Sequence, residues 1–122
     1  MAAAASPALV VYVTTPNSET SKLIAHGLVS SGLAACVNIL PGVTSVYRWQ
    51  GAVNSDTEEL LIVKSTAQHL PELTQAVLRM HPYDTPEVLA VPAVGGSAAY
   101  IQWLAASADG KAIAQSTPET IQ

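Results

Sequence analysis

The sequence predicts an α+β fold, a ferredoxin-like βαββαβ sandwich with a long kinked hairpin and an extra C-terminal helix. Apolar, β-branched segments alternate with segments of helical periodicity in the order strand, helix, strand, strand, helix, strand. A right-handed crossover in each strand–helix–strand unit places both helices on one face of a single antiparallel sheet. The other face of that sheet is then left uncovered.

The first strand and helix are predicted from apolar content and capping residues. Residues 8–15 are apolar and β-branched, and the Pro16-Asn17 pair that follows indicates a turn. Asn17 or Ser18 can accept a hydrogen bond at the start of a helix, and Gly32 is suited to end it.

The next segment is predicted to be one long hairpin with arms of unequal length. Its outgoing arm, 34–53, is interrupted by Pro41-Gly42, which predicts a kink. A turn signal at 54–56 leads to a returning arm at 56–65. Because the outgoing arm is longer, part of its backbone is expected to stay unpaired until a neighbouring chain pairs with it.

A second helix and a last strand complete the predicted sandwich. Residues 68–79 place apolar side chains on one helical face, and Pro82 ends the helix. Residues 87–94 form a strand whose Pro92 lacks an N–H group, so a sheet edge or a bulge is expected there. An additional helix begins at Ser97.

A chain of 122 residues is expected to form one domain. We place this domain at residues 1–107. Residues 108–122 are polar, contain a proline and lack periodicity, so they are expected to form a flexible tail.

The composition predicts self-association. Hydrophobic residues make up 49% of the chain and charged residues only 11%, against about 25% charged residues in a typical soluble domain. No apolar run approaches the roughly 18 residues of a membrane span. The surplus apolar surface is therefore expected to form a subunit interface.

Charge and cysteine content restrict the partners and the compartment. Five basic and nine acidic residues give a net charge of −4, and the basic residues are scattered, so nucleic-acid binding is disfavoured. The single cysteine, Cys36, cannot form an internal disulfide, and the first eight residues lack the features of a secretory signal. A cytoplasmic location is expected, with an organelle as the alternative if a targeting segment has been removed.

Four motifs in the right order resemble the CutA family of divalent-cation tolerance proteins. The motifs are LAACVNILPGVTSVYRWQG, EELLIVKS, HPYDTPEVLAVP and YIQWL, and the resemblance runs from about Leu9 to Ala106. It implies a ferredoxin-like fold and an interlocked homotrimer similar to the PII signalling proteins. It also implies a role in metal tolerance, towards copper in bacteria, or in anchoring enzymes in eukaryotes, where a plant version lies in the chloroplast.

The resemblance bears on metal binding at three positions. Copper-binding bacterial relatives carry a cysteine where this chain has Val13 and a histidine where it has Met80, so two of the three donors of their site are absent. His81 matches the remaining donor and is the candidate metal ligand, for Cu²⁺ or another divalent cation, although none is expected to be essential. The alternative is that His81, at the end of the second helix, interacts with the helix dipole.

The segment HPYDTPEV, residues 81–88, concentrates polar side chains around two prolines. Tyr83, Asp84 and Glu87 are predicted to converge with Lys64 in a binding cleft between subunits, because a rigid backbone limits the entropy lost on binding. The alternative assigns Asp84 to a turn, and Lys64 to a salt bridge with Asp84 or Glu87 across a subunit contact.

Aromatic and acidic residues are predicted at the subunit interface. Tyr47 and Trp49 share one strand face, and Trp103 lies on the last helix. We assign these three to trimer packing, with ligand binding as the alternative. Glu58 and Glu59 begin a strand after a turn and are expected to be solvated, although Glu59 can join the interface.

Two functional hypotheses follow. The first is a homotrimer for divalent metal tolerance or response that binds a metal or a small ligand at an intersubunit cleft. The second is a non-catalytic trimeric scaffold that anchors protein partners. Neither a GxSxG motif nor a glycine-rich phosphate loop occurs, so we do not expect an enzyme.

Overall fold

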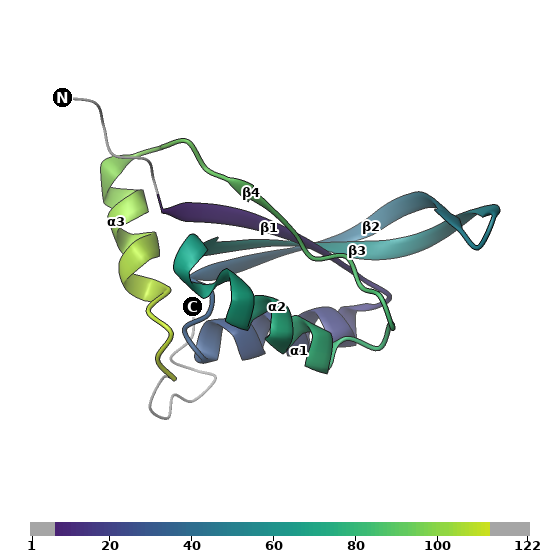
Figure 1. Cartoon of the computed structure of the whole chain (residues 1–122), viewed down its shortest axis with the longest axis horizontal. Coiled ribbons are helices and arrows are strands. Elements are labelled where there is room, and N and C mark those ends of the chain that lie inside the picture. The colour runs from purple at the N-terminus through teal and green to yellow at the C-terminus, as the bar shows by residue number, and fades with distance from the viewer. Residues whose placement is uncertain (1–6, 113–122) are drawn as a thin grey trace.

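A computed structural model describes residues 7–112 of the protein, and it has the predicted α+β architecture (Figure 1). The elements are β1 Ala8–Thr15, α1 Ser18–Ser30, β2 Cys36–Trp49, β3 Ala52–Thr66, η1 Ala67–His69, α2 Leu70–Met80, β4 Leu89–Pro92 and α3 Ala98–Ser107. Four strands form one antiparallel sheet in the order β2-β3-β1-β4, which is the order of a ferredoxin-like sandwich. Helices α1 and α2 cover one face of this sheet, and α3 stands at the end away from the hairpin tip.

The core forms between the sheet and the two covering helices. Val11 and Val13 of β1 are opposite Val63 and Leu61 of β3, and all four are fully buried. Alternate residues of each strand point to opposite faces, so this set meets the helices while the residues between point away from them. The helices contribute buried side chains to the same cluster, namely Ile24, Leu28, Leu73, Ala76 and Val77.

Helix α1 begins as its sequence predicts. Asn17 has an extended backbone, and its side-chain oxygen accepts a hydrogen bond from the backbone N–H of Thr20 at 2.8 Å. This cap satisfies one of the N–H groups that a helix start leaves unpaired. Of the two predicted candidates, Asn17 and Ser18, Asn17 is therefore the N-cap.

The hairpin turn lies at Gln50-Gly51, and the prediction of a turn at 54–56 was wrong. Both turn residues have positive φ angles, 49° and 79°, which a two-residue hairpin turn requires and which glycine adopts readily. The strands pair up to Trp49 opposite Ala52, so the two arms match in length and the outgoing arm has no unpaired extension of the predicted kind within the described hairpin. Residues 54–56 lie within β3 instead.

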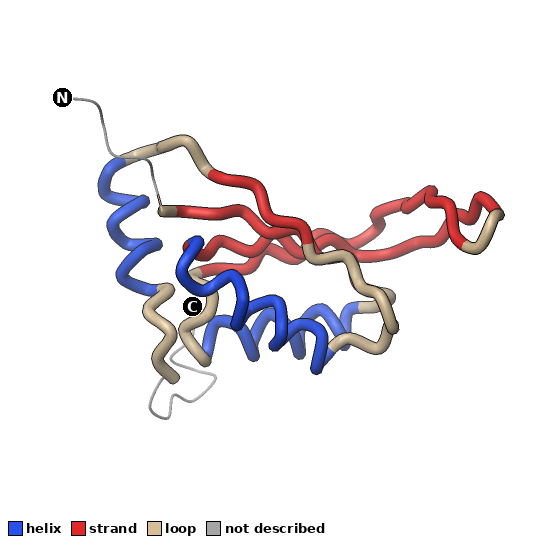
Figure 2. The backbone as a smooth tube through the Cα atoms, viewed as in Figure 1, coloured by secondary structure: helices blue, strands red, loops and turns tan. Residues whose placement is uncertain are grey.

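The predicted kink in the hairpin is confirmed as a bulge. Leu40 is opposite Leu60, whereas Val43 is opposite Glu58, so the register shifts by one residue at Pro41-Gly42. Beyond this point the hairpin extends past the ends of the covering helices (Figure 2).

Strand β4 is an edge strand, as the proline in its sequence predicts. In the described sheet it pairs only with β1, and Pro92 lies opposite Leu9. The strand is shorter than the predicted 87–94, because the backbone pairs with β1 only over Leu89–Pro92.

Contacts with the sandwich continue after residue 107, where we predict that the domain ends. Ala108 is buried against α3, and the N–H of Gly110 donates to the carbonyl of Gly32 at 2.9 Å. Ala108 and Gly110 therefore hold the start of the predicted tail against the sandwich. Residues 113–122 of that tail lie outside the described residues, and its flexibility stays a prediction. Within residues 7–112, no helix has the length and hydropathy to cross a membrane.

Candidate functional site

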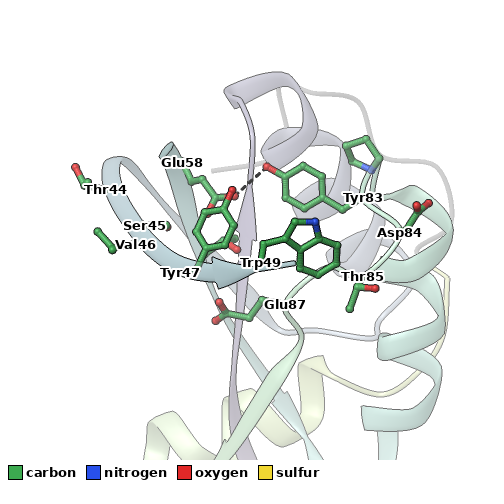
Figure 3. A pocket seen from close by; sticks show the side chains of 12 residues that line it. Thr44, Ser45, Val46, Tyr47, Trp49, Glu58, Tyr83, Asp84, Thr85 and Glu87 are labelled. Carbon is green, nitrogen blue, oxygen red and sulfur yellow. Dashed lines mark hydrogen bonds between the residues drawn. The ribbon is translucent and has the colours of Figure 1, made fainter. Parts of the chain in front are cut away.

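A cleft of about 820 Å³ lies between the distal hairpin and the loop that joins α2 to β4 (Figure 3). Its chemically distinctive lining consists of three carboxylates and three aromatic side chains, and we call it the Tyr83 cleft. These residues are Tyr47, Trp49, Glu58, Tyr83, Asp84 and Glu87. Among residues 7–112, no lysine, arginine or histidine lines it.

The bulge in β2 determines which side chains reach the cleft. Before the bulge, Asn38 and Leu40 share a face with Ile62 of β3; after it, Tyr47 and Trp49 share that face. A one-residue slip exchanges the two faces of a strand, so without the bulge both aromatic side chains would point to the opposite side. The kink therefore places Tyr47 and Trp49 beside Glu58.

Glu58 is the buried carboxylate of the cleft, with only 7% of its surface exposed. The hydroxyl of Tyr83 donates a hydrogen bond to its Oε2 at 3.0 Å, which Figure 3 shows as a dashed line. Burial, and then this hydrogen bond to an anion, raise the pKa of Tyr83 to about 12. The expectation that Glu58 is solvated was wrong, because the loop of Tyr83 folds over it.

A second tyrosine and carboxylate pair lies further along the hairpin. The hydroxyl of Tyr47 donates to the carboxylate of Asp56, and this hydrogen bond is the main cause of the raised pKa of Tyr47. Tyr47 is 40% exposed, so this pair is more accessible to solvent than that of Glu58.

Glu87 contributes another carboxylate to the lining of the cleft. Burial raises its pKa above the ordinary value, and the negative charge of Glu58 adds to the effect. Both influences disfavour a second negative charge in the cleft. Among the described residues, no basic side chain lines the cleft to neutralise these acidic groups.

The structure brings three of the four predicted binding residues together. Tyr83, Asp84 and Glu87 line the cleft, but Lys64 lies elsewhere on the sheet. Its Nζ donates to the side-chain oxygen of Asn38 and lies 4.0 Å from the sulfur of Cys36. A contact between Lys64 and the carboxylates stays a prediction about a neighbouring copy.

His81 is tied into the fold through both ring nitrogens. The backbone N–H of Tyr83 donates to Nδ1 at 3.2 Å, so the neutral ring carries its proton on Nε2, which lies 2.7 Å from the carbonyl oxygen of Thr14. The side chain is 7% exposed. A metal ion at His81 would have to displace one of these contacts, and residues 7–112 contain no group of three or more His, Cys, Asp or Glu arranged to hold a metal ion.

The predicted interface residues occupy three places. Tyr47 and Trp49 line the cleft, while Trp103 on α3 is 47% exposed and lies 5.5 Å from the ring of Tyr100. Glu59 is opposite Thr15 in the sheet, and its Oε1 is buried with no hydrogen-bond partner among the described residues. Their role between subunits stays a prediction.

The fold and the cleft define a small ferredoxin-like sandwich with a projecting hairpin and an acidic, aromatic cleft. Residues 9–107 match the family model described as "CutA1 divalent ion tolerance protein". The chain belongs to this family, and the resemblance seen in its motifs is confirmed.

Relatives from plants and bacteria are similar over most of this chain. It is 54% identical over 98 residues to "Protein CutA, chloroplastic" of Arabidopsis thaliana, covering 80% of this chain and 54% of that protein. It is 50% identical over 95 residues to "Divalent-cation tolerance protein CutA" of Thermus thermophilus, covering 78% of this chain and 92% of that protein. The chain thus spans about half the length of its plant relatives.

Solved structures of the family have the same fold. The divalent cation tolerance protein Cut A1 from Thermus thermophilus superposes with a TM-score of 0.81 at 47% identity, covering 82% of this chain and 97% of that chain. The crystal structure of CutA1 from Oryza sativa gives 0.81 at 50% identity, covering 84% and 94%.

Proposed function

We propose that the protein is a homotrimer acting in the tolerance of, or response to, divalent cations, and that it binds a cationic ligand in the Tyr83 cleft. The main support for this proposal is the buried Glu58, which shares a cleft with Asp84 and Glu87. No basic residue of the described chain lines that cleft. A cation is the ligand that such an electrostatic environment favours. The proposal is one of binding rather than catalysis, since the relatives are named for tolerance and not for a reaction.

The trimer is supported by apolar surface that one chain leaves in water. Val46 and Val53 on one face of the hairpin are 67% and 72% exposed. Exposed apolar surface on a projecting hairpin is typical of a subunit contact. In such an assembly Lys64 can reach the carboxylates of the cleft only from a neighbouring copy.

Cu²⁺ or another divalent cation is the first ligand to test. The described residues of one chain do not assemble a metal site by themselves, so a metal would need donors from a neighbouring chain. Sedimentation velocity of the full chain gives the subunit number, and isothermal titration with CuSO₄ measures binding. We expect Glu87→Gln to weaken binding and Glu19→Gln, an acid of α1 outside the cleft, to leave it unchanged.

The role of His81 is separable in the same titration. Because both ring nitrogens already have backbone partners, we expect His81→Ala to lower stability and leave the copper heat per folded protein unchanged. A heat lost in this variant, with the fold intact by circular dichroism, would make His81 a ligand. No binding of any cation, or a chain that sediments as a monomer at micromolar concentration, would overturn the proposal.

A trimeric scaffold that anchors protein partners is the second candidate, and the surface of α3 favours it. The helix has no charged residue, and its Tyr100 and Trp103 form an exposed aromatic pair. Partners recovered with the full chain and lost with Trp103→Ala, in the absence of any cation binding, would support the scaffold.

The location of the protein is proposed from its relatives. Two plant relatives are named as chloroplastic, which supports the organelle alternative over the cytoplasm. Imaging of the fluorescently tagged product of the complete gene tests this directly.

A further inference from the structure

We infer that the ligand of the Tyr83 cleft is a small organic cation, with a primary ammonium or guanidinium group at the end of a hydrocarbon body. The inference rests on the proposed function, because it requires that the cleft binds a cation. It names the chemical class of that cation from the charge, the size and the aromatic lining of the cleft.

The size of the cleft suits a molecule better than a single ion. A volume of about 820 Å³ lies within the range of about 300–1,000 Å³ that small-molecule sites occupy. Calcium takes six to eight oxygen ligands and a tight copper site gathers several nitrogen or sulfur donors. Residues 7–112 offer no group of three or more such side chains around one point.

The carboxylates are arranged as separate acceptors rather than as one shell. Oε2 of Glu58 already accepts from Tyr83, and Asp56 outside the lining accepts from Tyr47. Glu58 thus keeps its other oxygen for a ligand, and Glu87 adds a second anionic group close enough to feel the charge of Glu58. An ammonium or guanidinium group donates several hydrogen bonds and matches such dispersed acceptors.

The aromatic lining distinguishes an organic cation from a hydrated metal ion. Tyr47, Trp49 and Tyr83 line the cleft and are 40%, 51% and 41% exposed in the chain. The face of an aromatic ring attracts an organic cation and packs well against hydrocarbon, and tryptophan is the most effective of the three. Such surface offers little to a strongly hydrated divalent ion, which keeps its water ligands.

The experiment is a titration of the full chain, carrying Trp103→Phe, with 1,4-diaminobutane. Tryptophan fluorescence is the signal that is measured. The substitution leaves Trp49 in the cleft as the only tryptophan, since the chain has two. We expect saturable quenching by the diamine and none by 1,4-butanediol, a neutral molecule of matched length. Isothermal titration with the unsubstituted chain supplies a readout independent of Trp49.

The variants assign the interaction to the cleft. By calorimetry, Trp49→Leu is expected to weaken diamine binding roughly three- to thirtyfold, the equivalent of a cation–π contact. Glu87→Gln is expected to weaken it by a similar factor, while Glu19→Gln and Trp103→Phe leave it unchanged. Circular dichroism and sedimentation of each variant show that fold and assembly are retained.

Four outcomes decide the inference. Diamine binding that depends on Trp49 and Glu87 supports it. Binding of CuSO₄ at the cleft without diamine binding overturns it and leaves the proposed function standing. No binding of either cation overturns both, and diamine binding that appears only after the chain is dissociated by dilution shows that a second copy, not a small molecule, fills the cleft.

Discussion

Glu58 shows how a single side chain is controlled by contacts far along the chain. It lies in β3, yet it is buried because Tyr83 from the loop after α2 covers it and donates to its carboxylate. A buried anion that loses a hydrogen-bond donor carries the full cost of its desolvation. The Tyr83 hydroxyl therefore stabilises the fold as well as the cleft.

We predict that Tyr83→Phe lowers the free energy of unfolding by about 1–2 kcal/mol, because it removes the donor and keeps the ring. Tyr47→Phe is the matched control. It removes a hydroxyl from an equivalent pair that is exposed, so its cost should be clearly smaller than that of Tyr83→Phe. Urea denaturation at neutral pH measures both, and equal costs would contradict a buried role for Glu58.

The pKa of Glu87 gives a prediction with a definite sign. Its pKa in the folded chain is raised above 4.5 by burial and by Glu58, so folding favours the protonated form. The stability that this shift contributes is fully present below pH 4.5, the ordinary pKa of the group. It is lost as the pH rises through the pKa of the folded chain. Glu87→Gln should therefore match the wild type at about pH 3 and be slightly more stable at about pH 7, by less than about 0.5 kcal/mol because the group is partly exposed.

Thermal unfolding across this pH range checks the Glu87 prediction. A variant that is less stable than the wild type at neutral pH would mean that the Glu87 charge is neutralised, for example by Lys64 of another copy. Under the proposed function, added cation should reverse the sign, since binding favours the charged form of Glu87.

At this scale the sequence could predict the local part of the site and not the rest. Tyr83, Asp84 and Glu87 share one short loop, so their meeting follows from proximity along the chain. Glu58 comes from β3, far from that loop in the sequence. Its burial depends on the path that the loop takes, and residue types do not specify this path. The signal that could have pointed to Glu58 is its place on the same strand face as Leu60 and Ile62.

The elements were predictable where periodicity was strong, and the hairpin turn was not. Asn54 and Asp56 are typical turn residues, but they pair with Tyr47 and Ser45 inside a ladder. Two-residue hairpin turns depend on positive φ angles. Gly51 adopts such an angle, whereas Asn54, inside the strand, does not. A Gly between two β-branched arms was the better signal.

The segment after α3 offers a prediction on how elements are tied together. Gly32, at the end of α1, has a φ of 74°, and a Cβ there would lie 2.6 Å from the backbone nitrogen of Lys111 and 2.7 Å from Oδ1 of Asp109. Gly42, in the β2 bulge, has a φ of 72°, and a Cβ there would meet no atom of the described chain within 4 Å. The two glycines have the same backbone demand and differ only in their surroundings.

We predict that Gly42→Ala costs about 1–2 kcal/mol through positive-φ strain alone. Gly32→Ala should cost roughly 1–3 kcal/mol more, because it also pushes residues 109–111 from their place. Hydrogen exchange at the Gly110 N–H, which donates to the Gly32 carbonyl, should become faster only in Gly32→Ala. Equal losses in the two variants would mean that the packed segment adds nothing to stability.

On the scale of the whole molecule, the uncovered sheet face is the feature that composition predicts best. Tyr12 and Ile62 pair across β1 and β3 on the face away from α1 and α2, and both are only half-buried in one chain. Leu40, on the same face, is 39% exposed. A chain with 49% hydrophobic residues has enough apolar surface for this face and a core together, whereas the partner that covers the face cannot be deduced from one chain.

A charge on this face should dissociate the assembly if a second copy covers it. We predict that the wild-type chain sediments at about three times 12.6 kDa at micromolar concentration, and that Ile62→Glu sediments as a single chain, because an unpaired carboxylate buried in an apolar interface costs several kcal/mol. Leu23→Glu is the matched control: Leu23 is 58% exposed on α1, so the same charge there should leave the mass unchanged. An Ile62→Glu chain that keeps the wild-type mass would show that the uncovered sheet face does not carry the contact between copies, and the hairpin, with Val46 and Val53, would have to carry it alone.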